Sequence, residues 1–345
     1  MFIFDKGSLT GVDIGSYAIK AIKIKGAGAS KTLSRVAYSR LDHIAIPEES
    51  SKLSEILKNV FNANRIKAKK VITVFSGGSL TIAHLFLPRM PKRDMKDAVR
   101  WEMRKHVAFP AEELVCDYTT IGEVKRGEDF ANSILAFGVR KRDIEKLIKI
   151  FEDALLEPSS IDVTPIAMLA AFNHNNVWEK GVSYSMIDIG NSKSTVAIFK
   201  DKKLMFTREI AIGGKELTMI VMENLACTEE VAEKEKIRCG VLQGSEKDTL
   251  ITTAIFGALE RLAAEVNRSF DYYQAQFREE SVSKIFLCGG TAKLKGIEDM
   301  FTHSLGVPCF VDDPLRNIKI EPKKFEPSRI KEFAPDMTVA VGLAL

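Results

Sequence analysis

The chain lacks the sequence signatures of several large classes of protein. Its five cysteines are scattered and form no C-x-x-C pair, so we interpret them as small apolar fillers in a reducing compartment. The five histidines show no metal-ligand spacing, and no Ser/His/Asp or Cys/His set can be assembled. No G-x-x-x-x-G-K-[ST] loop occurs, which excludes the P-loop fold.

Long apolar runs and a charge excess are missing as well. No apolar run reaches the roughly 18 residues that a membrane span needs, and Met1–Phe4 is too short for a signal peptide. The 50 basic and 46 acidic residues give a net charge of +4, which is too balanced to favour nucleic-acid binding. We therefore expect a soluble, intracellular protein. At 345 residues and 46% hydrophobic, it should fold into two or more domains.

What the chain does have is a repeated tripeptide. Asp-Ile-Gly occurs at Asp13–Gly15 and again at Asp188–Gly190, each time between two apolar runs. The flanks match at the same offset: Val12 with Ile187, Ser16 with Asn191, and Lys20 with Thr195. The pair predicts a duplicated domain.

The residue types of this repeat suit phosphate binding. Gly15 and Gly190 can adopt backbone angles closed to other residues, which turns the chain tightly and exposes N–H groups to an anion. Asp13 and Asp188 would repel a bare phosphate, but each could hold Mg²⁺ through water. The alternative is two ordinary β-hairpins. As a matched pair, the motifs favour nucleotide binding.

The segment from about Thr81 to Val163 reads as a separate α+β module inserted in the first half. It follows a strand–turn–strand opening, an amphipathic helix between Leu53 and Phe61, and a buried strand at Val71–Phe75. The expected elements of the module are, in order, strand Thr81–Leu87, helix Asp94–His106, strands Val115–Val124 and Ser133–Val139, helix Asp143–Leu155 and strand Ser160–Val163.

The second half repeats the opening and adds two glycine pairs. Gly213-Gly214 joins a strand to a helix, and Gly289-Gly290-Thr291 follows the buried strand Ile285–Cys288. Each could present free N–H groups of a helix start to a ligand, or be a plain tight connection. Glu233 and Lys236 lie three residues apart on a helix; they are either a solvated ion pair or ligands of a ribose and an adenine.

Basic residues outnumber acidic ones between Arg89 and Lys105, on and before the helix of the module. Most such runs are solvated helix faces. The less common interpretation is a contact for an acidic partner or for an anionic membrane surface.

The ordered glycine motifs resemble those of the actin, sugar kinase and heat-shock chaperone superfamily of ATP-binding proteins. The resemblance implies an α/β, actin-like fold, duplicated as in ribonuclease H, with an FtsA-type inserted subdomain. It places domain I at 1–80, 160–180 and 335–345, the inserted subdomain at 81–159 and domain II at 181–334. Thr164–Phe172, with Thr164 as N-cap, and Thr338–Leu345 match the two crossing helices.

The same resemblance implies bound ATP and Mg²⁺, with Mg²⁺ held by Asp13 and Asp188 through water. The implied nucleotide-binding residues are Asp13, Gly15, Ser16, Tyr17, Lys20, Asp188, Gly190, Asn191, Gly213, Gly214, Lys215, Glu233, Lys236, Gly289, Gly290 and Thr291.

Within the superfamily, three segments resemble the PilM family of type IV pilus assembly proteins: Trp101-Glu102 through Asp117-Tyr118, Thr207-Arg208-Glu209 through Leu217-Thr218, and Gly289 through Ile297. The resemblance implies a cytoplasmic protein at the inner face of the inner membrane, in a complex with other pilus platform proteins. It also implies docking of the short N-terminal cytoplasmic segment of PilN, a bitopic membrane protein, between the inserted module and the first domain. The strand Thr81–Leu87 and the helix Asp94–His106 would form that groove.

Two positions depart from the superfamily pattern. Tyr17 stands where relatives have a small polar residue, so it either crowds the γ-phosphate or stacks elsewhere. Thr164 stands where many relatives orient the attacking water, and a hydroxyl is a poor base unless Asp162 reaches in. We therefore expect at most weak ATPase activity. The alternatives are a small-molecule kinase and an FtsA-like filament-forming protein. Among partners, weak self-association of the chain is a further expectation.

Overall fold

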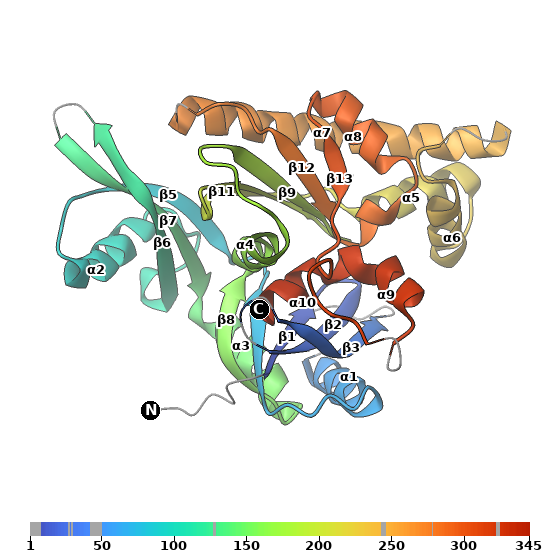
Figure 1. The fold of residues 1–345 in the computed structure, drawn as a ribbon, viewed down its shortest axis with the longest axis horizontal. Helices are drawn as coiled ribbons and strands as arrows, with labels where there is room; N and C mark the ends of the chain where they lie inside the picture. The colour runs from blue at the N-terminus through green and yellow to red at the C-terminus, as the bar shows by residue number, and fades with distance from the viewer. Residues whose placement is uncertain are drawn as a thin grey trace.

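Two five-stranded sheets with the same strand pattern form the two halves of the molecule (Figure 1). The computed structural model describes residues 8–26, 28, 30–41, 50–126, 129–242, 246–277, 279–321 and 325–345. The first sheet has the order β3-β2-β1-β4-β8 and the second the order β11-β10-β9-β12-β13. In each, three antiparallel strands are followed by two parallel ones, so the duplication predicted from the tripeptides is confirmed.

The strand bounds follow the apolar runs of the sequence. The first sheet contains β1 (Ser8–Ile14), β2 (Ala18–Lys25), β3 (Thr32–Arg40), β4 (Lys70–Phe75) and β8 (Glu157–Val163). The second contains β9 (Ser183–Ile189), β10 (Ser194–Lys200), β11 (Lys203–Ile210), β12 (Lys284–Cys288) and β13 (Cys309–Val311). Nearly every residue of β9 and β10 is buried, because helices cover both faces of these central strands.

Helices pack on both faces of each sheet. In the first half these are α1 (Ser50–Ala63), α3 (Lys141–Asp153), α4 (Thr164–Asn175) and α10 (Thr338–Leu343). In the second half, α5 (Gly214–Leu225), α6 (Glu229–Cys239), α7 (Glu246–Phe277) and α8 (Ile297–Leu305) cover one face of the sheet and α4 covers the other. Helix α9 (Pro327–Phe333) precedes the last crossing helix. The long α7 runs along the outer side of the second half (Figure 1). No helix in the described ranges is both long and apolar enough to cross a membrane.

The inserted module projects from one side of the molecule, at the left of Figure 1. It contains β5 (Thr81–Pro88), α2 (Lys92–Met103), the short 3-10 helix η1 (Ala111–Glu113), β6 (Leu114–Arg126) and β7 (Asp129–Arg140). Its sheet has the order β5-β7-β6, and α2 covers one face through Met95, Val99 and Met103.

Two elements that we expected in the module belong to the first half. The predicted strand Ser160–Val163 is the end of β8, which pairs in parallel with β4. The predicted helix Asp143–Leu155 is α3, whose Ile150 and Phe151 share a core with α1. The expectation was wrong because the apolar face of α3 finds its buried partner in the first half. The domain limits drawn from the sequence stay a prediction.

The two crossing helices, α4 and α10, pack closely against each other. A Cβ built on Gly342 of α10 would lie only 1.8 Å from the carbonyl oxygen of Ala167 in α4, so this contact needs glycine. The cap predicted for α4 was off by one residue. Val163 is the N-cap and Thr164 already has helical geometry, with Pro165 in the first turn where it needs no N–H partner.

Candidate functional site

A cleft of about 940 Å³ is lined by residues of both halves. It takes its walls from the turns after β1 and β9, from the start of α5, from α6 and from the loop after β12. Most of the nucleotide-binding residues predicted from sequence line it. They are Asp13, Gly15, Ser16, Tyr17, Lys20, Asp188, Gly190, Asn191, Gly214, Glu233, Lys236, Gly289, Gly290 and Thr291.

The two Asp-Ile-Gly turns meet across this cleft. Ser16 Oγ lies 3.2 Å from Ser192 Oγ, and Asn191 Nδ2 lies 3.5 Å from Ser16 Oγ. Both turns are hairpin turns, closed by a hydrogen bond from Gly15 N to Ala18 O and by the matching one from Gly190. The alternative of two ordinary hairpins is therefore right about the local geometry, but it does not account for their facing one cleft.

The reason for glycine in these turns differs from the one we expected. Gly15 and Gly190 are not among the residues with positive φ, so neither turn uses a left-handed backbone. Space is the constraint instead. A Cβ on Gly190 would lie 2.9 Å from Lys193 O, and one on Gly15 would lie 3.3 Å from Ala18 O. The glycines keep the turns tight rather than twisting them.

The first turn carries its own counter-ion. Lys20 Nζ donates to Asp13 Oδ2 at 2.8 Å, and both side chains are largely buried. Burial alone would lower the pKa of Lys20, but the charge and hydrogen bond of Asp13, with Asp188 and Asp336 further away, raise it overall. Lys20 is therefore a permanent cation at the floor of the cleft.

The second turn has no such partner. Within the described residues Asp188 makes no ion pair or side-chain hydrogen bond. Burial raises the pKa of Asp188 to about 6, with Lys20 acting in the opposite direction and Asp13 adding to the rise. Asp188 is thus a carboxylate that a bound cation would stabilise.

This donor set fits a hydrated Mg²⁺ better than a directly bound metal. In the described part of the cleft, no three His, Cys, Asp or Glu ligand atoms lie within 4.8 Å of one another. Mg²⁺ usually keeps several waters and takes one or two carboxylates together with phosphate oxygens. Asp188, with Asp13 beside it, offers that number of protein ligands.

The loop after β12 presses against the second turn. Gly289 has φ +85°, and a Cβ there would lie 2.3 Å from Asp188 Oδ1, so only glycine fits. Thr291 Oγ1 lies 3.4 Å from Gly190 O. The Gly289-Gly290-Thr291 segment and the second Asp-Ile-Gly turn therefore form one wall.

Glu233 and Lys236 form a buried network rather than a solvated pair, so that alternative is wrong. Lys236 Nζ contacts Glu233 Oε2 at 2.6 Å, Thr218 Oγ1 at 2.8 Å and Gly214 O at 3.1 Å. Burial lowers the pKa of Lys236, although Glu233 offsets part of that effect. The network fixes two polar side chains at the edge of the cleft. Their assignment to ribose and adenine stays a prediction.

Two predicted residues support the cleft from behind and do not line it. A Cβ on Gly213 would lie 2.5 Å from Asn191 O. The N–H groups of Gly214 and Lys215 donate to Gly190 O and Asn191 O, both at 2.8 Å. Of the two interpretations given for this helix start, free N–H groups or a tight connection, these bonds support the tight connection, because both N–H groups hold the second Asp-Ile-Gly turn.

A charged pair beside the loop after β12 was not predicted from the sequence. Lys293 Nζ donates to Asp336 Oδ2 at 2.8 Å, and the Asp336 side chain is only 1% exposed. Asp336 Oδ1 has no hydrogen-bond partner in the described part of the chain. Both residues line the cleft, yet no local motif marks them. Only the folded chain brings the start of the last crossing helix beside the loop after β12.

The structure shows what the two residues that depart from the superfamily pattern, Tyr17 and Thr164, contact. The Arg40 guanidinium lies 5.0 Å from the centroid of the Tyr17 ring, so Tyr17 stacks on a cation at the rim. Thr164 lines the cleft, but Asp162 does not. Asp162 Oδ1 instead accepts the backbone N–H of Val163 at 2.8 Å. Neither residue supplies a carboxylate base facing the cleft.

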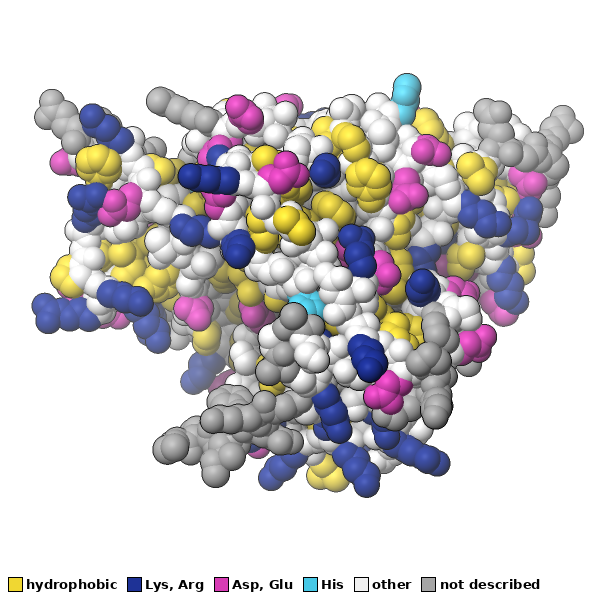
Figure 2. Space-filling view, in the orientation of Figure 1, with side chains coloured by type: hydrophobic (Ala, Val, Ile, Leu, Met, Phe, Trp, Pro, Cys, Tyr) yellow, Lys and Arg dark blue, Asp and Glu magenta, His cyan; other side chains and the backbone are white. Residues whose placement is uncertain are grey.

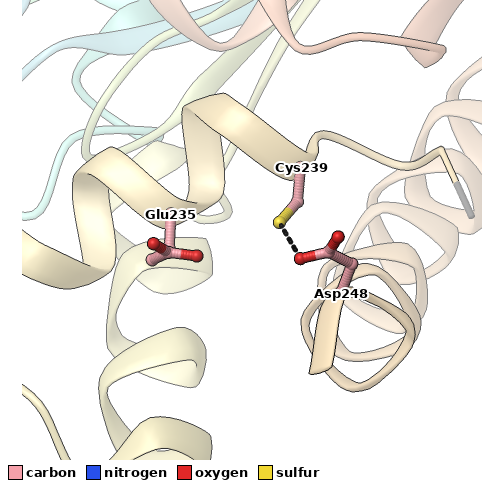
Figure 3. Close-up of side chains that lie close together, drawn as sticks. All are labelled: Glu235, Cys239 and Asp248. Carbon is pink, nitrogen blue, oxygen red and sulfur yellow. Dashed lines mark hydrogen bonds between the residues drawn. The ribbon is translucent and has the colours of Figure 1, made fainter. Parts of the chain in front are cut away.

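A second cluster of possible metal ligands lies outside the cleft, at the junction of α6 and α7 (Figure 3). Cys239 points toward Asp248, with Sγ 3.5 Å from Oδ1, and Glu235 lies one turn earlier. Arg238 already pairs with both carboxylates, at 2.7 Å from Glu235 Oε2 and in a short contact with Asp248. The guanidinium supplies the positive charge here, so this cluster is structural.

Comparison with known proteins adds family information. The sequence profile of the family described as type IV pilus assembly protein PilM matches residues 11–345. Cell division protein FtsA of Bacillus subtilis (strain 168) is 25% identical over 211 residues, which cover 56% of this chain and 48% of FtsA. FtsA of Enterococcus hirae is 25% identical over 193 residues, covering 50% and 42%. The chain spans about half the length of these curated relatives.

Solved structures agree on the fold. A chain of the PilM-PilN type IV pilus biogenesis complex superposes with a TM-score of 0.86 at 24% identity, covering 97% of each chain. MreB 5 of Spiroplasma citri bound to AMPPNP superposes with a TM-score of 0.53 at 13% identity, covering 98% of this chain and 95% of its own. The predicted actin-like, two-domain α/β fold is confirmed.

Proposed function

The chain belongs to the family of type IV pilus assembly protein PilM, and from that membership we propose that it binds ATP with Mg²⁺ and uses the nucleotide as a conformational clamp. In this proposal the two halves close on the triphosphate. Closure changes the affinity for a membrane-anchored partner, which is a short PilN-like peptide at the inner face of the inner membrane.

One observation carries the nucleotide part of the proposal. The two Asp-Ile-Gly turns, far apart in the sequence, touch through Ser16 and Ser192 and face the same cleft. The fold neighbour MreB 5 is described as bound to AMPPNP, and this supports a triphosphate in the corresponding place. Two turns around one triphosphate would make domain closure depend on the ligand.

The residues of the chain have separate roles in this proposal. Lys20 lies on the cleft floor, where its ammonium would neutralise phosphate charge, and Asp13 holds it there. Asp188 would hold Mg²⁺ through water, with Asp13 as the second carboxylate. When bound, Mg²⁺ would screen the phosphate charge from both carboxylates. The Glu233–Lys236 network would meet the nucleoside.

Hydrolysis is slow or absent in this proposal. A general base must come within hydrogen-bond reach of the attacking water, and the side chain at the relevant position is the hydroxyl of Thr164. Asp162 is turned to its own backbone. A kinase would need such a base as well as a polar substrate pocket, so a clamp fits the cleft better than a transferase.

A hollow of about 340 Å³ at the base of the module offers a place for the peptide. Lys96, Asp97 and Arg100 of α2 and Lys141, the first residue of α3, line it together with Glu112 and the Leu114–Cys116 start of β6. β6 is an edge strand, which can pair with an added extended segment. The groove we propose is therefore formed by α2 and β6. It differs from the groove expected from the sequence, because β5, the predicted strand Thr81–Leu87, contributes no residue to this hollow.

The experiment measures ATP·Mg²⁺ affinity, peptide affinity and phosphate release on the full chain, with a synthetic N-terminal PilN peptide. We expect Mg²⁺-dependent ATP binding, a change in peptide affinity when ATP is present, and little phosphate release. Asp188→Ala should abolish the Mg²⁺ dependence, whereas the matched control Asp201→Ala, on an exposed turn, should not. Fast phosphate release stimulated by a small molecule would favour a kinase. ATP-dependent light scattering would favour an FtsA-like filament.

A further inference from the structure

The outward face of α2 carries a tryptophan that the fold leaves uncovered. Met95, Val99 and Met103 turn inward onto the module sheet. Trp101, on the opposite side, is 65% exposed, and the Arg104 guanidinium lies 5.3 Å from its ring centroid. Trp combines a large apolar ring with a polar N–H group and is enriched at interfaces for that reason, so the exposed ring marks this side of α2 as a candidate contact surface.

This face has an excess of positive charge. Arg93 pairs with Asp94 at 3.4 Å, and Lys105 pairs with Glu102 at 2.7 Å. Within the described residues Lys96, Arg100 and Arg104, which follow one another at every fourth position, have no ion-pair partner, and Asp97 is the nearby acid on the same face. Figure 2 shows exposed apolar side chains bordered by Lys and Arg on the module, at the left of the view.

We propose that this face of α2, centred on Trp101 and Arg104, binds the surface of a bilayer that contains anionic lipid. Trp is favoured at the boundary between head groups and acyl chains, where its apolar ring and its N–H group are both accommodated. Lys and Arg next to an anionic leaflet each contribute about 1 kcal/mol of attraction. The charge and the aromatic ring of this face both match such a surface.

The proposed peptide site also favours a bilayer as the partner of this face. This part of the inference rests on the proposed function. The hollow that we assign to the peptide shares Arg100 with the outward face of α2. A short segment next to a membrane span reaches only about 3.3–3.6 Å per residue, so the module that holds it must lie close to the bilayer. The α2 face would then meet the head groups directly.

The test measures binding of the full chain to vesicles of phosphatidylcholine, with and without phosphatidylglycerol, in the absence of peptide. We expect binding only when phosphatidylglycerol is present, and weaker binding as salt is added. The double variant Arg93→Gln with Arg104→Gln changes no residue of the hollow. It should weaken vesicle binding about 25-fold, because each cation contributes about fivefold to the affinity for anionic lipid. The matched control, Lys180→Gln with Lys331→Gln, removes two exposed cations outside the module and should bind as the unaltered chain does.

Tryptophan fluorescence gives a second readout, because the chain has two tryptophans. Trp178 donates to Asn173 and packs on Phe172, so its emission reports folding. Vesicles should shift the emission of the unaltered chain to the blue, and Trp101→Phe should remove that shift.

Three results would overturn the proposal: binding that ignores phosphatidylglycerol, equal binding by the Arg93/Arg104 variant and the control, or an unchanged blue shift in Trp101→Phe. If the full chain binds peptide and ATP but does not bind the vesicles, only the proposal for the α2 surface is contradicted. If the full chain binds the vesicles but binds neither peptide nor ATP, only the proposed function is contradicted.

Discussion

The first and second Asp-Ile-Gly turns share a backbone and differ in charge. In the first hairpin, Asp13 stands opposite Lys20 and forms an ion pair with it. In the second, the residue opposite Asp188 is Thr195, which brings no charge. The same geometry thus gives one neutralised carboxylate and one carboxylate whose pKa burial raises to about 6.

We infer from this difference that the two turns have separate tasks. Asp13 completes a buried ion pair, so the folded first half depends on it. Asp188 lines the cleft and has no ion-pair partner among the described residues, so in the proposed function ligand binding depends on it. Each of the following substitutions tests one side of this division.

The largest expected effect is loss of stability in Asp13→Asn. The substitution leaves the Lys20 ammonium buried without its partner, which typically costs about 3–5 kcal/mol of unfolding free energy. Urea denaturation followed by circular dichroism measures it. Asp188→Asn breaks no pair and removes a buried carboxylate whose pKa is raised, so it should lose no stability in the same experiment at neutral pH.

A double variant separates the buried charge from the lost contact. Asp13→Asn with Lys20→Met removes both members of the pair, and buried pairs replaced together are often nearly neutral. We expect the double variant to be more stable than Asp13→Asn. If the two are equally unstable, the ion pair is not what stabilises the first turn.

The two halves also differ in how closely a crossing helix approaches the central strand. A Cβ on Gly11 of β1 would lie 2.2 Å from Ala340 O of α10. The matching residue of β9 is Met186, a full-sized side chain packed in the core with α4. The first half therefore accepts only glycine where the second has room for methionine.

Gly11→Ala should lose about 1–3 kcal/mol of unfolding free energy, the usual cost of forcing extra volume into a packed site. Gly257→Ala in the long α7 is the matched control. Nothing lies within 4 Å of its added methyl group, so it should gain up to about 1 kcal/mol from helix propensity. Equal changes in the two variants would mean that α10 can move away from β1 at little cost.

The parts of the fold that a short stretch of sequence determines could be predicted from that stretch. The paired tripeptides predicted two similar halves, because each needs only one strand–turn–strand unit. The apolar spacing predicted helix α1 and the strand β4 nearly to their ends. The packing partners predicted for α3 and β8 were wrong, because sequence spacing identifies the buried face of an element but not the element that packs against it.

The same limit applies to the cleft. Most of the predicted residues that line the cleft belong to short motifs that turn the backbone or follow the end of a strand, and such motifs can be recognised in the sequence. The Lys293–Asp336 pair joins two segments brought together only by the last crossing helix, so no local spacing reveals it. The sequence already showed Lys20 in the first half and Thr195 at the matching position of the second half. Only the hairpin register shows that these residues stand opposite Asp13 and Asp188.

The titration of Asp188 gives a smaller effect. Its pKa is raised from 3.8 to about 6 in the folded chain, so the folded state binds the proton more tightly than the unfolded state does. Without nucleotide, this contribution to stability is complete below about pH 4 and is lost as the pH rises through 6. Asp188→Asn should therefore equal the unaltered chain at low pH and exceed it by on the order of 1 kcal/mol at pH 8.

Nucleotide binding should follow the opposite trend. In the proposed function the ionised carboxylate of Asp188 would hold Mg²⁺, so the ATP·Mg²⁺ affinity of the unaltered chain should rise as the pH rises through 6. Isothermal titration calorimetry at several pH values measures it. A pH-independent affinity would place the Mg²⁺ contact on another group.

The smallest effect concerns Tyr17, which stands where the second turn has Ser192. Its ring contacts the Arg40 guanidinium at 5.0 Å, a contact worth about 0.5–1 kcal/mol at an exposed site. Tyr17→Ser should lose about that much stability in urea, while Tyr17→Phe should retain most of it. Because the ring stacks on Arg40 at the rim, ATP affinity should stay within about twofold in both variants. Tighter ATP binding by Tyr17→Ser would mean instead that the ring crowds the γ-phosphate, and that the first turn binds phosphate less well than the second.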